Sequence, residues 1–126
     1  MVLRGEVMQV VDRFRRAGHP VGHIANANFM ICGAATGEKG PGVDFEKTAT
    51  TKAALQKALA ESFAFCDQAY AAMTDARGAE TVTFFGGERA RLSVLAFNTA
   101  HNYEHYGNIV TYMRLKGMVP PSSAGR

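Results

Sequence analysis

Hydrophobic residues recur with the period of an α-helix in four segments of the chain, which predicts a mainly helical protein. The first segment, at about 2–17, is short and is closed by Gly18. In the second, Pro20 suits a first helical turn and Gly37 suits the end. One face of this helix is expected to carry His23, Ala27, Met30 and Ala34.

The other two helices are longer. After a loop rich in glycine, Thr50 or Thr51 suits the N-cap of the third helix. Its apolar stripe is expected to consist of Leu55, Leu59, Phe63, Cys66, Tyr70 and Met73. A second loop, which holds a short strand-like VTFF at 82–85, leads to a fourth helix at about 88–116, ended by Gly117. We therefore predict an all-α fold, a four-helix bundle with a shortened first helix.

Composition fits this fold and narrows the function. With 126 residues and 47% hydrophobic content, the chain is expected to form one domain over 1–126. The net charge of +3 comes without a stripe of lysine and arginine interleaved with aromatic residues. Nucleic acid is therefore not expected as a partner.

The cysteines and the hydrophobic runs bear on the compartment. Cys32 and Cys66 lie far apart in apolar helical segments, so we expect two buried thiols and no disulfide. The first twenty residues lack the core of a signal peptide, and no apolar run is long enough to span a bilayer. A cytoplasmic protein without membrane contact is predicted.

Two histidines in the fourth helix are the clearest candidates for chemistry. His101 and His105 are one turn apart, so they share a helix face, with Cβ atoms roughly 5–6 Å apart. Two imidazoles can converge on a cation, but a catalytic zinc generally has three protein ligands. A third would have to be His19 or His23, the only other histidines of the chain. The alternative is that the pair lies on a solvated face by coincidence.

Other polar residues accompany this pair. Asn26, Asn98, Asn102 and Asn108 either orient imidazoles or a substrate, or make ordinary polar contacts between helices. Glu104 lies between the two histidines in sequence, so it should point away from their face into solvent. The remaining face of the fourth helix is so apolar that most of this helix is expected to be buried.

Several motifs, taken in order, resemble the DinB-like (DinB/YfiT) superfamily over about 22–123. They are HIANANFMICGAATGEKGP, SFAFCDQAY, FFGGERARL and NTAHNYEHYGNIVTYMRLKGMVPPSS. The resemblance implies an antiparallel four-helix bundle, often dimeric, in which three histidines bind a divalent metal such as zinc or nickel. Matched by position, those ligands are His23, His101 and His105, and His19 is a surface or capping residue. Residues 1–21 depart from the family pattern and are interpreted as a divergent or truncated region.

The resemblance also implies a function. Some members are metal-dependent transferases or isomerases that use low-molecular-weight thiols, so the chain is predicted to transfer a thiol to a small electrophile. Its partners would be that small molecule, the thiol and a second copy of the chain. No side chain is assigned as a nucleophile, because the metal would activate the thiol. The alternatives are a non-catalytic metal-binding module and a purely structural or interaction bundle.

Overall fold

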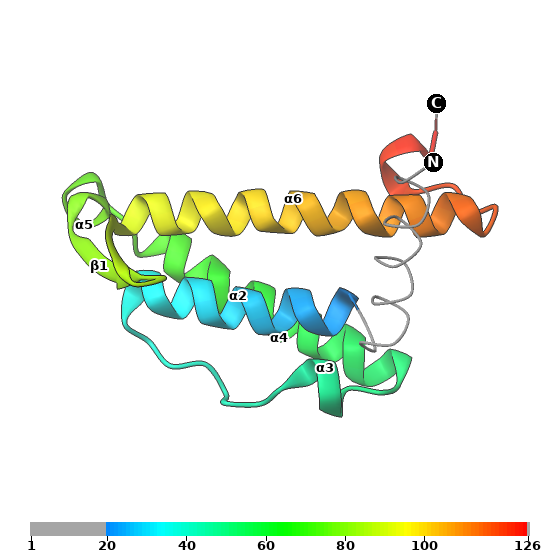
Figure 1. Cartoon of the computed structure of the whole chain (residues 1–126), viewed down its shortest axis with the longest axis horizontal. Coiled ribbons are helices and arrows are strands. Elements are labelled where there is room, and N and C mark those ends of the chain that lie inside the picture. Colours follow the sequence, from blue (N-terminus) through cyan, green and yellow to red (C-terminus); the bar gives the residue numbers. More distant parts are fainter. Residues whose placement is uncertain (1–19, 126) are drawn as a thin grey trace.

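Three long helices and a β-hairpin make up most of the structure, a computed structural model that describes residues 20–125 (Figure 1). Three predictions concern residues 1–19, which lie outside the described residues. They are the short helix at 2–17, the surface or capping role of His19, and most of the divergent region 1–21. Within the described part, all-α is the correct fold class. The helices are α2 (Pro20–Thr36), α3 (Phe45–Thr48), α4 (Lys52–Ala71), α5 (Asp75–Ala79), α6 (Arg91–Leu115) and the short 3-10 helix η1 (Pro121–Ser123).

Helix α2 lies at the centre of this arrangement. It packs against both α4 and α6, whereas the backbones of α4 and α6 approach each other at few points and these two helices meet through side chains such as Tyr70, which donates to the Leu95 carbonyl at 2.9 Å. Small residues on α2 permit these close approaches, among them Ala25, Ala27 and Ala35, all buried. The helix ends where it was predicted to end, because Gly37 adopts a φ of +84° and so serves as the left-handed terminator.

The segment between α2 and α4 was predicted as a loop, and in part this was wrong. Asp44 is the N-cap residue of the short helix α3, and Asn26 of α2 accepts a hydrogen bond from the backbone N–H of Phe45 at 2.8 Å. This interaction between distant residues holds α3 beside α2. Periodicity could not reveal it, because a four-residue helix is about one turn long.

Helix α4 begins as predicted, but of the predicted apolar stripe only Cys66 is among its buried residues. The Thr51 side chain accepts a hydrogen bond from the Ala54 N–H, as an N-cap does. Its buried residues are Ala58, Ser62, Cys66 and Ala69, whereas Phe63 and Tyr70 of the predicted stripe are exposed. The reason is that, among the described helices, α4 packs mainly on α2, through its small residues.

A two-stranded antiparallel hairpin precedes α6. Strands β1 (Thr81–Phe84) and β2 (Gly87–Ala90) pair with Phe84 opposite Gly87, so the strand-like VTFF at 82–85 does contain a strand, shifted by one residue, with Phe85 in the turn. Because Gly87–Ala90 is a strand, α6 starts at Arg91 and not near residue 88. Arg91 donates hydrogen bonds to the Ala35 carbonyl at 2.6 Å and to Glu80 at 3.0 Å, which ties the start of α6 to the end of α2.

Helix α6 is less buried than its apolar sequence suggested. Its buried residues are Val94, Leu95, Asn98 and His105, whereas Tyr103 is 73% exposed. The prediction of a mostly buried helix was therefore wrong for the described part of the structure. Figure 1 shows that α6 extends well past the start of α2, so its last turns do not lie beside α2.

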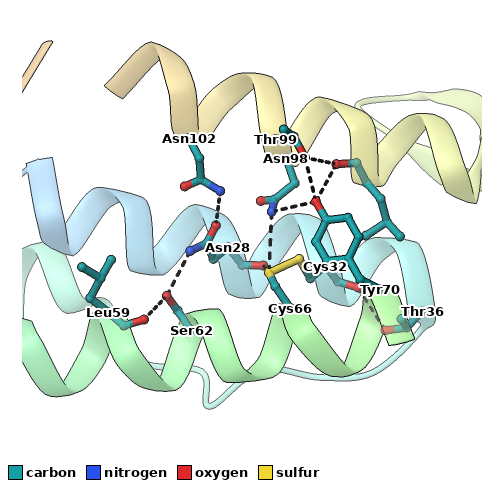
Figure 2. Close-up of a disulfide and its surroundings, with 11 residues drawn as sticks. Asn28, Cys32, Thr36, Leu59, Ser62, Cys66, Tyr70, Asn98, Thr99 and Asn102 are labelled. Carbon is teal, nitrogen blue, oxygen red and sulfur yellow. Dashed lines mark hydrogen bonds between the residues drawn. A yellow bond between two sulfur atoms is a disulfide. The ribbon is translucent and has the colours of Figure 1, made fainter. Parts of the chain in front are cut away.

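The core contains a covalent link that the sequence did not predict. Cys32 of α2 and Cys66 of α4 are both buried, as expected, but they form a disulfide (Figure 2). Helix packing places their Cα atoms 5.4 Å apart, within the usual range for a disulfide. Sequence separation alone could not show that these two positions face each other.

A polar chain crosses the same core. Asn102 of α6 donates to Asn28 of α2 at 2.9 Å, and Asn28 donates to Ser62 of α4 at 3.1 Å (Figure 2). Asn28 and Ser62 are fully buried, so these hydrogen bonds hold the three helices in register. This row of hydrogen-bonded side chains begins at Asn102, the residue after His101, and so stabilises the part of α6 that carries the histidines.

In the part of the chain that the structure describes, no helix combines the length and apolar character needed to cross a membrane.

Candidate metal centre

The two histidines of α6 point to a common spot. His101 and His105 lie on successive turns, and their Nε2 atoms are 3.1 Å apart. Their rings meet edge to face, with centroids 4.4 Å apart. The helical spacing thus has the geometric consequence that the sequence analysis expected.

The third imidazole comes from the first turns of α2. His23 Nε2 lies 3.4 Å from His101 Nε2, and the three ligand atoms of His23, His101 and His105 all lie within 4.8 Å of one another. A zinc ion bound at about 2.0–2.1 Å in a tetrahedral site keeps its ligand nitrogens about 3.3 Å apart. The three histidines could therefore hold one metal ion with little rearrangement.

The chemistry of the donors fits a cation as well. Burial is the main cause that lowers the pKa of His101, followed by the neighbouring imidazoles of His105 and His23. Burial and then His23 lower the pKa of His105. Both rings are thereby favoured as neutral imidazoles, the form that donates a lone pair to a metal.

The opposite ring nitrogens have unequal surroundings. His23 Nδ1 lies 3.3 Å from Glu46 Oε1 on α3, and His105 Nδ1 lies 3.4 Å from the Asn108 side-chain amide. The Nδ1 atom of His101 is buried and has no hydrogen-bond partner among residues 20–125. Sequence reasoning missed Glu46, because this residue lies in a glycine-rich segment more than twenty positions from His23 in the chain. No local signal there indicated a role at the site.

The four asparagines divide between the two interpretations offered for them. Asn108 contacts an imidazole of the triad, as a residue that orients a ligand would. Asn98 and Asn102 instead make contacts between helices, with Tyr70 and Asn28 respectively. Asn26 contacts Asp44 and Glu46, so it reaches the triad only through α3.

Aromatic side chains border the triad on the side of the hairpin. The Phe97 ring lies one turn before His101 and stacks near it, with centroids 6.2 Å apart. Phe84 and Phe85 of the hairpin lie 5.5 and 6.0 Å from Phe97, and Phe85 is 72% exposed. An exposed apolar row thus runs from the hairpin to the histidines.

A separate groove lies between α4 and α6. It has a volume of about 450 Å³, and its lining includes Phe63, Tyr70, Tyr103 and Ile109. No histidine of the triad lines it. The groove is therefore distinct from the candidate metal centre.

Comparison with known proteins identifies a family and agrees with the helical fold. No curated protein and no solved structure matches the sequence. Residues 14–109 match the DinB superfamily, and this match contains all three histidines and most of α2, α4 and α6. The chain belongs to the DinB superfamily.

Proposed function

We propose that the protein binds a divalent transition metal, zinc or nickel, through His23, His101 and His105. We further propose that it is a metal-dependent transferase that joins a low-molecular-weight thiol to a small electrophile. The observation that carries the proposal is the convergence of three Nε2 atoms from two helices. Three ligands leave at least one coordination position open, which is typical of catalytic and not of structural zinc sites.

Three neutral imidazoles suit this chemistry. Because they add no negative charge, a divalent cation among them keeps its full charge and can lower the pKa of a thiol or polarise an electrophile. In the proposed reaction the thiol loses its proton to water, and its sulfur forms a bond to an electrophilic carbon. The leaving group departs with the electron pair of the bond that breaks.

The aromatic row supports an electrophile with an apolar part. Phe97 lies next to His101 and Phe85 lies next to Phe97, and both are exposed, so an apolar group could lie along them. Burial of apolar surface contributes about 25 cal/mol per Å², so even a partial contact would favour binding.

The proposed partners are thus a small molecule and a thiol, with no part for nucleic acid or a membrane. A homodimer also stays a prediction, and the apolar groove between α4 and α6 is a surface that a second copy could cover. The cytoplasmic location stays a prediction as well. The expectation of two free thiols no longer supports this location, because Cys32 and Cys66 form a disulfide.

Turnover is tested with the metal-loaded protein, a panel of small thiols such as cysteine and glutathione, and the chromogenic electrophile 1-chloro-2,4-dinitrobenzene. We expect thioether formation above the uncatalysed rate, lost in the His101→Ala, His105→Ala double variant and retained in Thr111→Ala. Thr111 is exposed on the same helix and serves as the matched control. Metal binding without turnover of any thiol and electrophile tried would favour the non-catalytic metal-binding module instead.

A further inference from the structure

We propose that α3 is a positioning element of the metal centre, in which Glu46 holds His23 in the tautomer that binds metal. This inference rests on the metal-binding part of the proposed function and not on thiol transfer. It assigns roles to Glu46, Asn26 and Gly22, none of which belongs to the triad.

Glu46 of α3 contacts His23 of α2 directly. Glu46 Oε1 lies 3.3 Å from His23 Nδ1, on the side of the ring opposite the Nε2 atom that approaches His101. A carboxylate at this position can accept a hydrogen bond from Nδ1–H, which places the lone pair of a neutral ring on Nε2. The same contact fixes the rotation of the ring, and hydrogen bonding to a carboxylate makes the imidazole a stronger donor.

Glu46 is itself held in place by Asn26 of α2. Its other oxygen, Oε2, lies 3.4 Å from the Asn26 side-chain amide, which also donates to Asp44 at 2.9 Å. Asn26 Oδ1 accepts the Phe45 N–H at 2.8 Å. Asn26 follows His23 by three residues on α2, so one side chain links the metal-bearing turn of α2 to the N-cap and the first two residues of α3.

Helix α3 needs such an anchor because it has no buried residue of its own. Its Phe45 ring stacks on Phe29 of α2, with centroids 5.8 Å apart, but four residues cannot form a stable isolated helix. The Asn26 contacts, this aromatic stack and the close approach to α2 therefore determine where Glu46 lies.

The close approach depends on Gly22. A Cβ atom at this position would lie 2.9 Å from the Phe45 carbonyl oxygen and 3.1 Å from the Glu46 Cα. Any side chain there would push α3 away and with it the carboxylate. The residue immediately before the ligand His23 thus allows the orienting group to reach it.

The experiment measures the affinity for Co²⁺ and Zn²⁺ by competition with a chelating dye, for the wild type and matched variants. Glu46→Ala and Asn26→Ala should weaken binding about 10–100-fold, the usual effect of removing a group that orients a ligand. Glu46→Gln should weaken binding less than Glu46→Ala, because its carbonyl still accepts from Nδ1–H. The control Glu61→Ala removes an exposed carboxylate on α4 and should stay within twofold of wild type. A native circular dichroism spectrum of each variant excludes unfolding, and an unchanged affinity in Glu46→Ala would overturn the proposal.

A second readout needs no metal. In long-range ¹H–¹⁵N NMR spectra of metal-free protein at pH 8, His23 should be in the Nδ1–H form and should shift toward the Nε2–H form in Glu46→Ala. His23 already in the Nε2–H form in the wild type would overturn the proposal. Failure of thiol transfer changes neither readout, and failure to bind metal would overturn the proposed function while the tautomer still decides the role of Glu46.

Discussion

Two glycines on the helices that carry the triad have opposite surroundings, and this difference is testable. Within the described part of the chain, a Cβ on Gly107 of α6 would meet no atom within 4 Å beyond the adjacent backbone of its own helix, whereas at Gly22 of α2 the backbone of α3 is in the way. Gly107→Ala should therefore stabilise the protein by about 0.5–1 kcal/mol through helix propensity.

Gly22→Ala should instead destabilise it by about 1–2 kcal/mol, because overpacking outweighs the gain in propensity. Urea unfolding followed by circular dichroism compares the two substitutions directly. Equal effects of the same sign would mean that α3 does not lie against α2 as described.

The histidines predict how stability depends on pH in the metal-free protein. Their ordinary pKa is 6.5, and burial lowers the pKa of His101 and His105 in the folded state, although Glu104 opposes the shift at both. As pH falls below about 6.5, the unfolded chain takes up protons before the folded one, so stability is lost until the lowered pKa values are reached.

The urea midpoint measured with chelator present should thus fall between pH 8 and pH 5, and fall less in the His101→Gln, His105→Gln double variant. Parallel curves for the two proteins would contradict this account of the buried imidazoles.

At the scale of elements, strong local sequence signals were sufficient to predict helix ends, whereas contacts between elements could not be predicted from the sequence. Gly37 and Thr51 mark a helix end and a helix start as predicted, because each acts through its own backbone or side chain. The start of α6 was placed too early because Gly87–Ala90 pairs with β1, a contact that helical periodicity does not encode. Helix α3 escaped prediction for the same reason, since its anchor Asn26 lies on another helix.

The disulfide between α2 and α4 leads to a prediction about stability. Cys32 and Cys66 are 34 residues apart in sequence, and closing a loop of this size removes chain entropy from the unfolded state. Reduction, or the Cys32→Ala, Cys66→Ala double substitution, should lower the free energy of unfolding by about 3–4 kcal/mol. Thiol titration of the denatured, unreduced protein should detect no free thiol. Two titratable thiols, together with a melting temperature that does not respond to reductant, would contradict the link.

At the scale of the whole molecule, the three histidines of the candidate site could be predicted from the sequence, whereas the residues around them could not. The His101–His105 pair follows from helical spacing, and the resemblance to the DinB superfamily singled out His23 over His19. The structure brings His23 to the other two across α2 and α6. The orienting carboxylate of Glu46 and the aromatic row at Phe97 could not be predicted, because they depend on how α3 and the hairpin fold back onto the long helices.

The central claim is that three histidines from two helices form one metal site, and elemental mass spectrometry of the purified, metal-loaded protein tests it most directly. His23 is the informative position, because a surface pair on α6 would not need it. We expect about one zinc or nickel ion per chain in the wild type and in Thr111→Ala, and loss of the ion in His23→Ala and in the His101→Ala, His105→Ala double variant. A protein that cannot be loaded, or a His23→Ala variant that retains the full metal content, would contradict the claim.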